Sequence, residues 1–232
     1  MLVRGNGQSR RENRALAPWR RWVQTWREDH EQHAAARARA RAHAPLRPGE
    51  RLLAVACSAG SELLVATDWA LYHQAGQSWA RLGWDQVGRV DWDEQRRVLM
   101  LAGLTPAVPA RTMLHLAKCW DLPAVAAERA SWAKVVDQRI SLNGEAGARV
   151  IARRVPGGPQ VRWLVVLDQG LDAADPRVRA GLDAAIAELR AATGPDMVRA
   201  PNPGLGGRGE IRPGCNQQQA AGVISGWQSL WA

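Results

Sequence analysis

The chain has 232 residues, of which 46% are hydrophobic, and this length and composition indicate a folded protein of one large or two small domains. No stretch approaches the roughly 18 consecutive apolar residues of a membrane-spanning helix, and residues 1–22 lack the apolar segment of a secretory signal. Three widely spaced cysteines, Cys57, Cys119 and Cys215, are typical of reduced thiols rather than of disulfides or a metal cluster. We therefore expect a cytoplasmic protein with no cofactor and no bound metal.

The net charge of +9 is unevenly distributed along the chain. Residues 1–50 hold 11 arginines against 5 acidic residues, a net +6, whereas residues 51–193 hold 17 basic against 15 acidic residues, a net +2. A folded domain that grips a nucleic-acid backbone usually carries the basic excess itself. The nearly neutral centre argues against that class of protein for the central part of the chain.

Residues 1–17 lack periodicity, and we predict that they are disordered. From Pro18 onward, Trp19, Trp22 and Trp26 fall on one stripe of a helix, and good helix formers continue until Pro45. Three interpretations follow: the tryptophan stripe docks on the folded domain, it contacts a partner or a membrane surface, or the arm is loose.

Alternating arginines follow in the same arm, at Arg37, Arg39 and Arg41. They could hold phosphates or an anionic membrane surface, or they could be the solvated face of a helix. Together with the three tryptophans, these arginines are the candidate partner-binding residues.

Six β-rich pieces with short connections follow between residues 51 and 103: "RLLAVACS", "ELLVAT", "ALYHQ", "SWARLG", "WDQVGRVDWD" and "RVLMLAG". This spacing predicts an antiparallel meander that curls into a small barrel or sandwich. The hinge after "ELLVAT" has no glycine, so we expect Asp68 to make an Asx-type turn. Residues 111–133 are predicted to be a helix that is interrupted at Pro123.

A second block begins after this helix, with "VVDQRISL", "ARVIARRV" and "VRWLVVLD" as three predicted strands, the last buried on both faces. A helix follows, with Asp175 as its N-cap and Pro176 at its first position, and it ends at Gly194. Residues 195–232 are rich in glycine and proline without any sustained period, which predicts a disordered tail.

The segment "GERLLAV…ELLVATDWALYH…WARLGWDQVGRVDWD" resembles the bacterial pleckstrin-homology-like (PH-like) and GRAM-like β-domains. The positions that carry the resemblance are Thr67, Asp68, Leu71, Tyr72, Trp84 and Asp85. Over residues 48–193 the chain is also similar to a group of proteins of unassigned function from high-GC actinobacteria, through "WDQVGRVDWD", "VIARRVPGG" and "VRWLVVLDQGLDAADPRVRA". The resemblance implies a curved sheet capped by a helix, which binds lipids, peptides or protein partners through loops or a groove.

The expected fold class is therefore α+β, divided into four parts. They are a basic and partly helical N-terminal arm (1–47), a PH-like antiparallel β-meander with a capping helix (48–133), a β-β-β-α unit (134–194) and a disordered tail (195–232).

The function expected first is a non-enzymatic binding or scaffold module that recognises a protein or peptide through the sheet edge or the meander loops. Lipid headgroup binding is disfavoured, because residues 51–102 hold only five scattered arginines among six acidic residues. The alternative is association with nucleic acid or an anionic surface through the arginine-rich arm. An enzyme, either a hydrolase or a transferase, is the third possibility.

Two further groups of residues have the spacing of a metal site or of a reactive site. Asp168, Asp172 and Asp175 lie between a strand and a helix, where three carboxylates could hold a hard cation or serve as turn and cap residues. Ser131 and Lys134 match a serine acylase spacing, but the companion motifs of that class are missing. We interpret both groups as structural.

Overall fold

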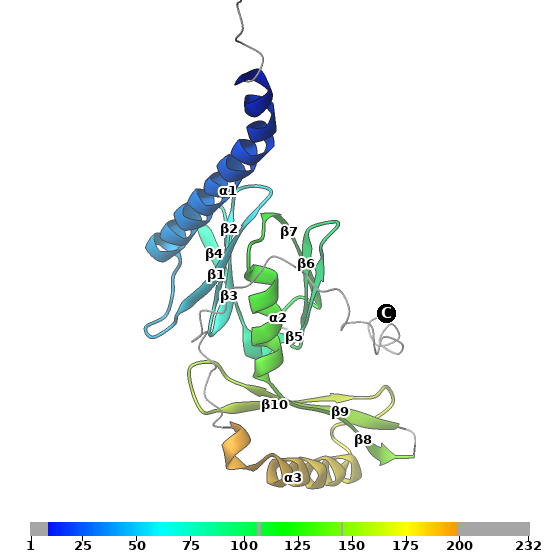
Figure 1. Ribbon diagram of the computed structural model, residues 1–232. Helices are drawn as coiled ribbons and strands as arrows, with labels where there is room; N and C mark the ends of the chain where they lie inside the picture. Colours follow the sequence, from blue (N-terminus) through cyan, green and yellow to red (C-terminus); the bar gives the residue numbers. More distant parts are fainter. Residues whose placement is uncertain (1–8, 106–107, 145, 199–232) are drawn as a thin grey trace, which may run out of the picture. The chain divides into compact units, whose positions relative to one another are not determined.

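The computed structural model describes residues 9–105, 108–144 and 146–198, which form a mixed α+β structure (Figure 1). The helices are α1 (Ser9–His43), α2 (Leu122–Ala133) and α3 (Pro176–Val198), with one short 3-10 helix, η1 (Trp84–Gln86). The first sheet contains β1 (Leu52–Ser58), β2 (Leu63–Thr67), β3 (Ala70–Ala75), β4 (Ser78–Gly83), β5 (Val87–Asp93), β6 (Val98–Gly103) and β7 (Arg111–Lys118). The second sheet contains β8 (Lys134–Asn143), β9 (Ala146–Arg154) and β10 (Val161–Leu167). Within the described residues, no helix has the length and apolarity that crossing a membrane requires.

The seven-stranded sheet is antiparallel, with the strand order β4-β3-β2-β1-β7-β6-β5. Its two end strands, β4 and β5, are neighbours in sequence and are joined only by η1. The sheet therefore curls into a half-barrel, which confirms the predicted curled meander (Figure 1). Each predicted β-rich piece matches one of the strands β1 to β6 to within one residue, except the fifth, whose first three residues form η1.

The prediction of a helix over residues 111–133 is wrong for its first part. Residues 111–118 form β7, which pairs along most of its length with β6. Leu114 and Leu116 point into the core, whereas the alternating residues Met113, His115 and Ala117 are exposed, and this alternation is the period of a strand. The helix α2 begins only at Leu122, so Pro123 lies in its first turn, where proline is tolerated.

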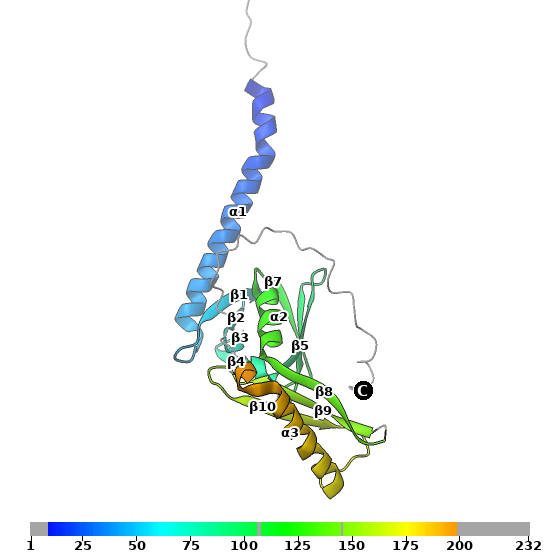
Figure 2. The ribbon, with the colours of Figure 1, turned by 60° about the horizontal axis from the view of Figure 1, so that its bottom comes forward.

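The main core lies between the concave side of the half-barrel and α2 (Figures 1 and 2). Trp84 is fully buried there, and its indole N–H donates a hydrogen bond to the Thr67 carbonyl at 2.8 Å. The helix faces this core with Leu122, Val125 and three alanines. Small side chains let a helix approach a sheet closely, so α2 closes the half-barrel on its inner side.

A second apolar cluster covers the other face of the sheet, where the C-terminal half of α1 packs on β1, β2 and β3. Ala36 and Ala40 of the helix lie against Val55, Val65 and Tyr72, all of which are buried. The helix begins at Ser9, so residues 9–17 do not belong to a disordered lead as predicted. The remaining lead, residues 1–8, lies outside the described residues.

The second sheet has the order β10-β9-β8, and α3 packs on β8 and β9 (Figure 2). The prediction that β10 is buried on both faces is wrong, because Val165 and Val166 are 38% and 45% exposed. The strand with both faces buried is the central one, β9, where Val150 and Ile151 are buried although they point to opposite faces. An apolar run reveals a strand, but it does not reveal whether that strand is central or at an edge.

The start of α3 agrees with the sequence. The Asp175 carboxylate accepts a hydrogen bond from the Arg177 backbone N–H at 2.8 Å, as expected of an N-cap. Gly194, with φ 61°, interrupts the helix at the predicted stop, although helical residues continue to Val198. Residues 199–232, which hold most of the predicted disordered tail and Cys215, lie outside the described residues.

Candidate functional site

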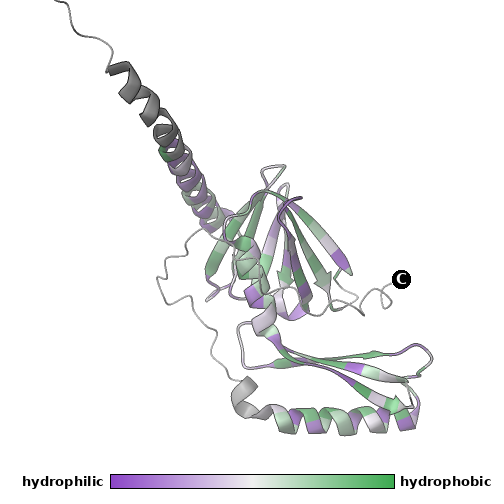
Figure 3. Ribbon diagram, turned by 45° about the vertical axis from the view of Figure 1, so that its right-hand side comes forward, coloured by the Kyte–Doolittle hydropathy of each residue, from purple (hydrophilic) through white to green (hydrophobic). Residues whose placement is uncertain are grey.

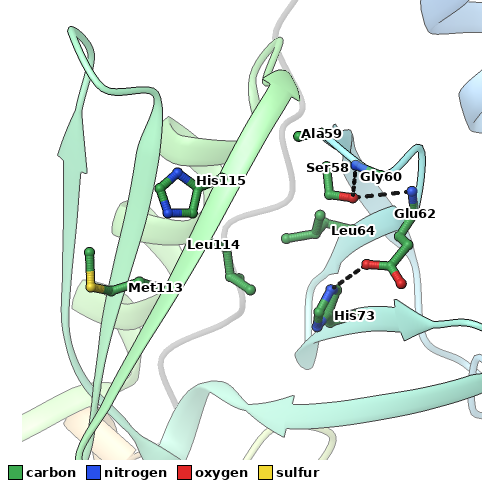
Figure 4. Close-up of a pocket in the computed structure, with 9 residues that line it drawn as sticks. All are labelled: Ser58, Ala59, Gly60, Glu62, Leu64, His73, Met113, Leu114 and His115. Carbon is green, nitrogen blue, oxygen red and sulfur yellow. Dashed lines mark hydrogen bonds and ion pairs between the residues drawn. The ribbon is translucent and has the colours of Figure 1, made fainter.

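The sheet opens between β1 and β7. These two strands pair only at their ends, through Cys57 with Lys118 and Ser58 with Leu116, and the register is irregular between the two pairs. A cleft of about 250 Å³ lies at this opening, lined by the β1–β2 turn, by Leu64 and His73 of β2 and β3, and by β7 (Figure 4). A second cleft, of about 360 Å³, lies between β8 and α3.

The edge of β7 in the cleft carries main-chain groups that are turned away from β6. The Leu116 N–H donates toward the β6 side, to the Arg97 carbonyl at 2.9 Å, and in an antiparallel strand alternate residues point in opposite directions. Met113 and His115 therefore direct their backbone groups into the cleft. The His115 carbonyl accepts from the Ala59 N–H at 3.3 Å, and strand pairing on this side extends no further toward Arg111.

The cleft has an apolar floor and a polar rim. Leu64 and Leu114 are buried beneath it, whereas Met113, which alternates with Leu114 along β7, is 52% exposed on the opposite face of the strand (Figure 4). Figure 4 places His73 and Glu62 on the opposite wall, where the His73 Nε2 atom lies 3.5 Å from a Glu62 carboxylate oxygen. The apolar floor formed by Leu64 and Leu114 fits an extended chain with an apolar side chain.

The β1–β2 turn forms a rigid rim to the cleft. The Ser58 hydroxyl oxygen accepts hydrogen bonds from the Gly60 and Glu62 backbone N–H groups, both at 3.2 Å. The Glu62 carboxylate in turn accepts from the Gly76 N–H at 3.3 Å. These bonds give Ser58 and Glu62 a structural role in shaping the turn.

Of the candidate tryptophans of the arm, Trp26 does not dock on the folded domain. The Trp26 side chain is 51% exposed, and its ring lies 3.9 Å from that of His30 on the same helix. The side chains of Trp19 and Trp22 lie outside the described part of the chain. The helix docks through Ala36 and Ala40 instead, which carry no aromatic signal.

Two of the three candidate arginines attach α1 to the sheet. Arg37 donates to the Leu53 carbonyl at 2.9 Å, and Arg39 donates to the Ser61 carbonyl at 3.2 Å. Partial burial, together with the nearby charge of Arg41, lowers the pKa of Arg37. Arg41 is exposed. Two of the candidate arginines thus help to dock the helix, and Arg41 faces the solvent.

A polar contact farther along the arm was missed by sequence reasoning. The Asp29 carboxylate accepts from the Lys118 ammonium at 2.8 Å and from the Trp120 indole N–H at 3.2 Å. The hydrogen bond from Lys118 lowers the pKa of Asp29, against the effect of partial burial. His33 stacks on Trp120 with ring centroids 4.8 Å apart. The partners are about ninety residues apart in sequence, so no local pattern indicates them.

The turn between β2 and β3 is built by Thr67 and not by Asp68, contrary to the predicted Asx turn. The Thr67 hydroxyl oxygen accepts from the Trp69 and Ala70 N–H groups at 3.2 and 2.9 Å. The Asp68 carboxylate instead accepts hydrogen bonds from Arg51, from the backbone N–H at 2.8 Å and from the side-chain Nε at 3.0 Å. The acidic residue therefore connects the turn to the start of β1.

A buried carboxylate lies beneath this turn. Glu50 is only 9% exposed, and it accepts hydrogen bonds from the Thr67 hydroxyl, from the Tyr72 hydroxyl at 2.6 Å and from the Arg47 N–H at 3.0 Å. Arg81 Nε donates to the Tyr72 oxygen at 3.1 Å. Burial, followed by the hydrogen bond to Glu50, raises the pKa of Tyr72.

Tyr72 is the single tyrosine of the chain, so its ionisation can be followed directly. Because its folded pKa is raised, we expect its stabilising contribution to be complete below pH about 10, the ordinary tyrosine value, and to decrease as the pH rises above it. Starting from the folded protein, tyrosinate absorbance should appear at a higher pH than it does in the denatured protein. Its appearance should coincide with unfolding. The unfolding free energy of Tyr72→Phe should depend less on pH in this range. Ionisation at the ordinary value in the folded protein would contradict the expectation.

Each of the three aspartates considered as a cation site has its own hydrogen-bond partners. Asp168 pairs with Arg139 and accepts from the Gly147 N–H at 2.7 Å, and Asp172 accepts from the Ala174 N–H at 2.8 Å. Asp175 caps α3. Across the described residues, no group of three or more His, Cys, Asp or Glu side chains is placed to hold a metal ion.

Comparison of the chain with protein-family models, with curated proteins and with solved structures gave no match.

Proposed function

We propose that this protein is a non-enzymatic binding module with a PH-like fold, and that it recognises an extended peptide or protein segment at the cleft between β1 and β7. The observation that carries the proposal is the stretch of β7 before Leu116, which within the described residues pairs with no strand on the β1 side and lies beside an apolar floor. A bound segment would add to this edge as a further strand, with main-chain hydrogen bonds for affinity and the floor for side-chain selection.

The arrangement of the strands supports the PH-like part of the proposal. A curved antiparallel sheet followed directly by a helix that closes it is what the resemblance implies, and α2 follows β7 in this way. The matching residue Thr67 builds the β2–β3 turn, and Asp68 connects this turn to Arg51. Trp84 and Asp85 lead through η1 into β5. In this proposal the motif residues maintain the fold, and the cleft binds the ligand.

The use of the arginines favours this proposal over nucleic-acid or anionic-surface binding through the arm. A phosphate clamp needs several cations that converge on one site. Arg37 and Arg39 donate to carbonyls of the sheet and of the β1–β2 turn, and Arg39 supports the rim of the cleft through Ser61. The arm is thereby assigned to holding the binding module in shape.

The proposal is tested by selecting peptides from a random library on the full-length protein and measuring their affinity by fluorescence anisotropy. In the variant Met113→Pro the lost N–H is one that points into the cleft, so the pairing with β6 stays intact. We expect this variant to bind a selected peptide about tenfold or more weakly. The control Met113→Val keeps the N–H and should bind within a few-fold of the wild type.

Circular dichroism and thermal denaturation establish that both variants are folded. Failure to select any peptide would overturn the proposal. So would a folded Met113→Pro variant that binds the selected peptides as tightly as the wild type does.

A further inference from the structure

The second sheet ends in an edge strand that lacks the usual protection against pairing. Along β10, the register with β9 is continuous from Val161 to Leu167, and the strand contains no proline and a single charged residue, Arg162. The other edge strand, β8, has two register irregularities. Edge strands are normally blunted by charge, proline or bulges, and a flat apolar edge without them is a site for strand addition. Figure 3 shows that hydrophobic and hydrophilic residues are mixed in this sheet.

The free main-chain groups of β10 belong to its odd-numbered residues. The Val155 N–H donates to the Gln160 carbonyl at 2.8 Å, and the Asp168 N–H donates to the Gly147 carbonyl at 2.9 Å, so even-numbered positions face β9. By alternation, Val161, Trp163, Val165 and Leu167 direct their N–H and C=O groups outward. Within the described residues, β10 has no strand on that side.

We propose that β10 pairs antiparallel with β10 of a second copy of this chain, so that two three-stranded sheets become one continuous sheet. With Leu164 on the two-fold axis, Val161 lies opposite Leu167, and Trp163 lies opposite Val165. All four are outward-facing residues, so these pairs are hydrogen-bonded pairs. An aromatic side chain opposite a β-branched one is a favourable cross-strand combination.

The charges of the strand are compatible with this self-pairing. Its one charged residue, Arg162, forms an ion pair at 2.6 Å with Asp85 of its own chain, and in this register it lies opposite Val166 rather than opposite its own copy. The Arg190 guanidinium lies 5.3 Å from the centre of the Trp163 ring and covers it from α3. A register centred on Trp163 or on Val165 would leave strand residues unpaired. The edge is therefore complementary to itself, which favours a second copy over an unrelated strand.

Sedimentation equilibrium of the full-length protein over roughly 1–100 µM tests the proposal, because an interface of one strand pair is small and dissociates readily. We expect the wild type to approach a dimer with increasing concentration. Val165→Pro removes an outward N–H without affecting the pairing with β9, and it should remain a monomer. The control Val165→Thr keeps the N–H and the β-branch, and it should dimerise.

A cysteine on the two-fold axis tests the register. In the Leu164→Cys variant, made in a Cys215→Ser background, the two new thiols occupy a non-hydrogen-bonded pair with Cα atoms about 4.5 Å apart, close enough for a disulfide. We expect oxidation to yield a covalent dimer, and the background protein without the new cysteine should yield none. A wild type that stays monomeric at every concentration would overturn the proposal, and so would a folded Val165→Pro variant that dimerises normally. Neither result bears on the Met113 cleft, which is tested separately.

Discussion

Deletion of residues 1–47 is expected to lower the free energy of unfolding by roughly 5 kcal/mol or more, whereas deletion of residues 1–28 should leave it close to that of the full chain. The reason is that α1 covers Val55, Val65 and Tyr72, which are at most 1% exposed. Each such side chain contributes about 1.5–3 kcal/mol when it is fully buried. The shorter deletion preserves every docking contact described above, from Asp29 onward. Urea denaturation followed by circular dichroism measures both changes.

A matched pair of substitutions tests the docking of α1 without shortening the chain. Ala40 of α1 is completely buried against the sheet, whereas Ala38 on the same helix is exposed. Ala40→Glu places a charge without a partner in the apolar interface, and we expect it to cost several kcal/mol. Ala38→Glu should change stability by less than about 0.5 kcal/mol. Equal stabilities for the two variants would show that the helix does not dock in solution.

Much of the half-barrel could be predicted because its strands are short, mostly apolar runs that are joined by local turns. The strand β7 was missed because Leu114 also fits a helical stripe with Leu122 and Val125, and only Leu116 marks the period of a strand. The residues through which α1 docks were missed for a related reason. Ala36 and Ala40 look like ordinary helix formers, while the exposed Trp26 carries a stronger apolar signal.

The candidate site could not be read from the sequence, because it arises from distant parts of the chain. The cleft exists because β1 and β7 pair only around Ser58 and Leu116, which are far apart in sequence. Similarly, both Thr67 and Asp68 are able to bond a turn, and the choice depends on Arg51, which is 17 residues before Asp68. Local chemistry identifies residues that can act, but tertiary contacts decide which of them do.

Arg153→Ala is expected to lower the free energy of unfolding by about 3–5 kcal/mol. This arginine of β9 is 1% exposed, and burial lowers its pKa. Its guanidinium donates to the Ala130 carbonyl at 2.7 Å, near the end of α2, and to the Gly88 carbonyl of β5 at 2.9 Å. Truncation would create a cavity and remove donors from two carbonyls, one of them near a helix C-terminus where acceptors lack helical partners.

Arg149 provides the matched control, since it lies on the same face of β9 and pairs at the surface with Asp137 at 2.6 Å. Its replacement by alanine should lower the free energy of unfolding by less than about 1 kcal/mol, as expected of a partly exposed ion pair.

Because Arg153 joins the second sheet to α2 and β5, its loss should also reduce the cooperativity of unfolding. The Arg153→Ala protein should then unfold in two steps when Trp fluorescence and circular dichroism are compared, whereas the Arg149→Ala protein should unfold in one. A stability loss below about 1 kcal/mol for Arg153→Ala, with one coincident transition, would mean that this buried arginine does not couple the two sheets.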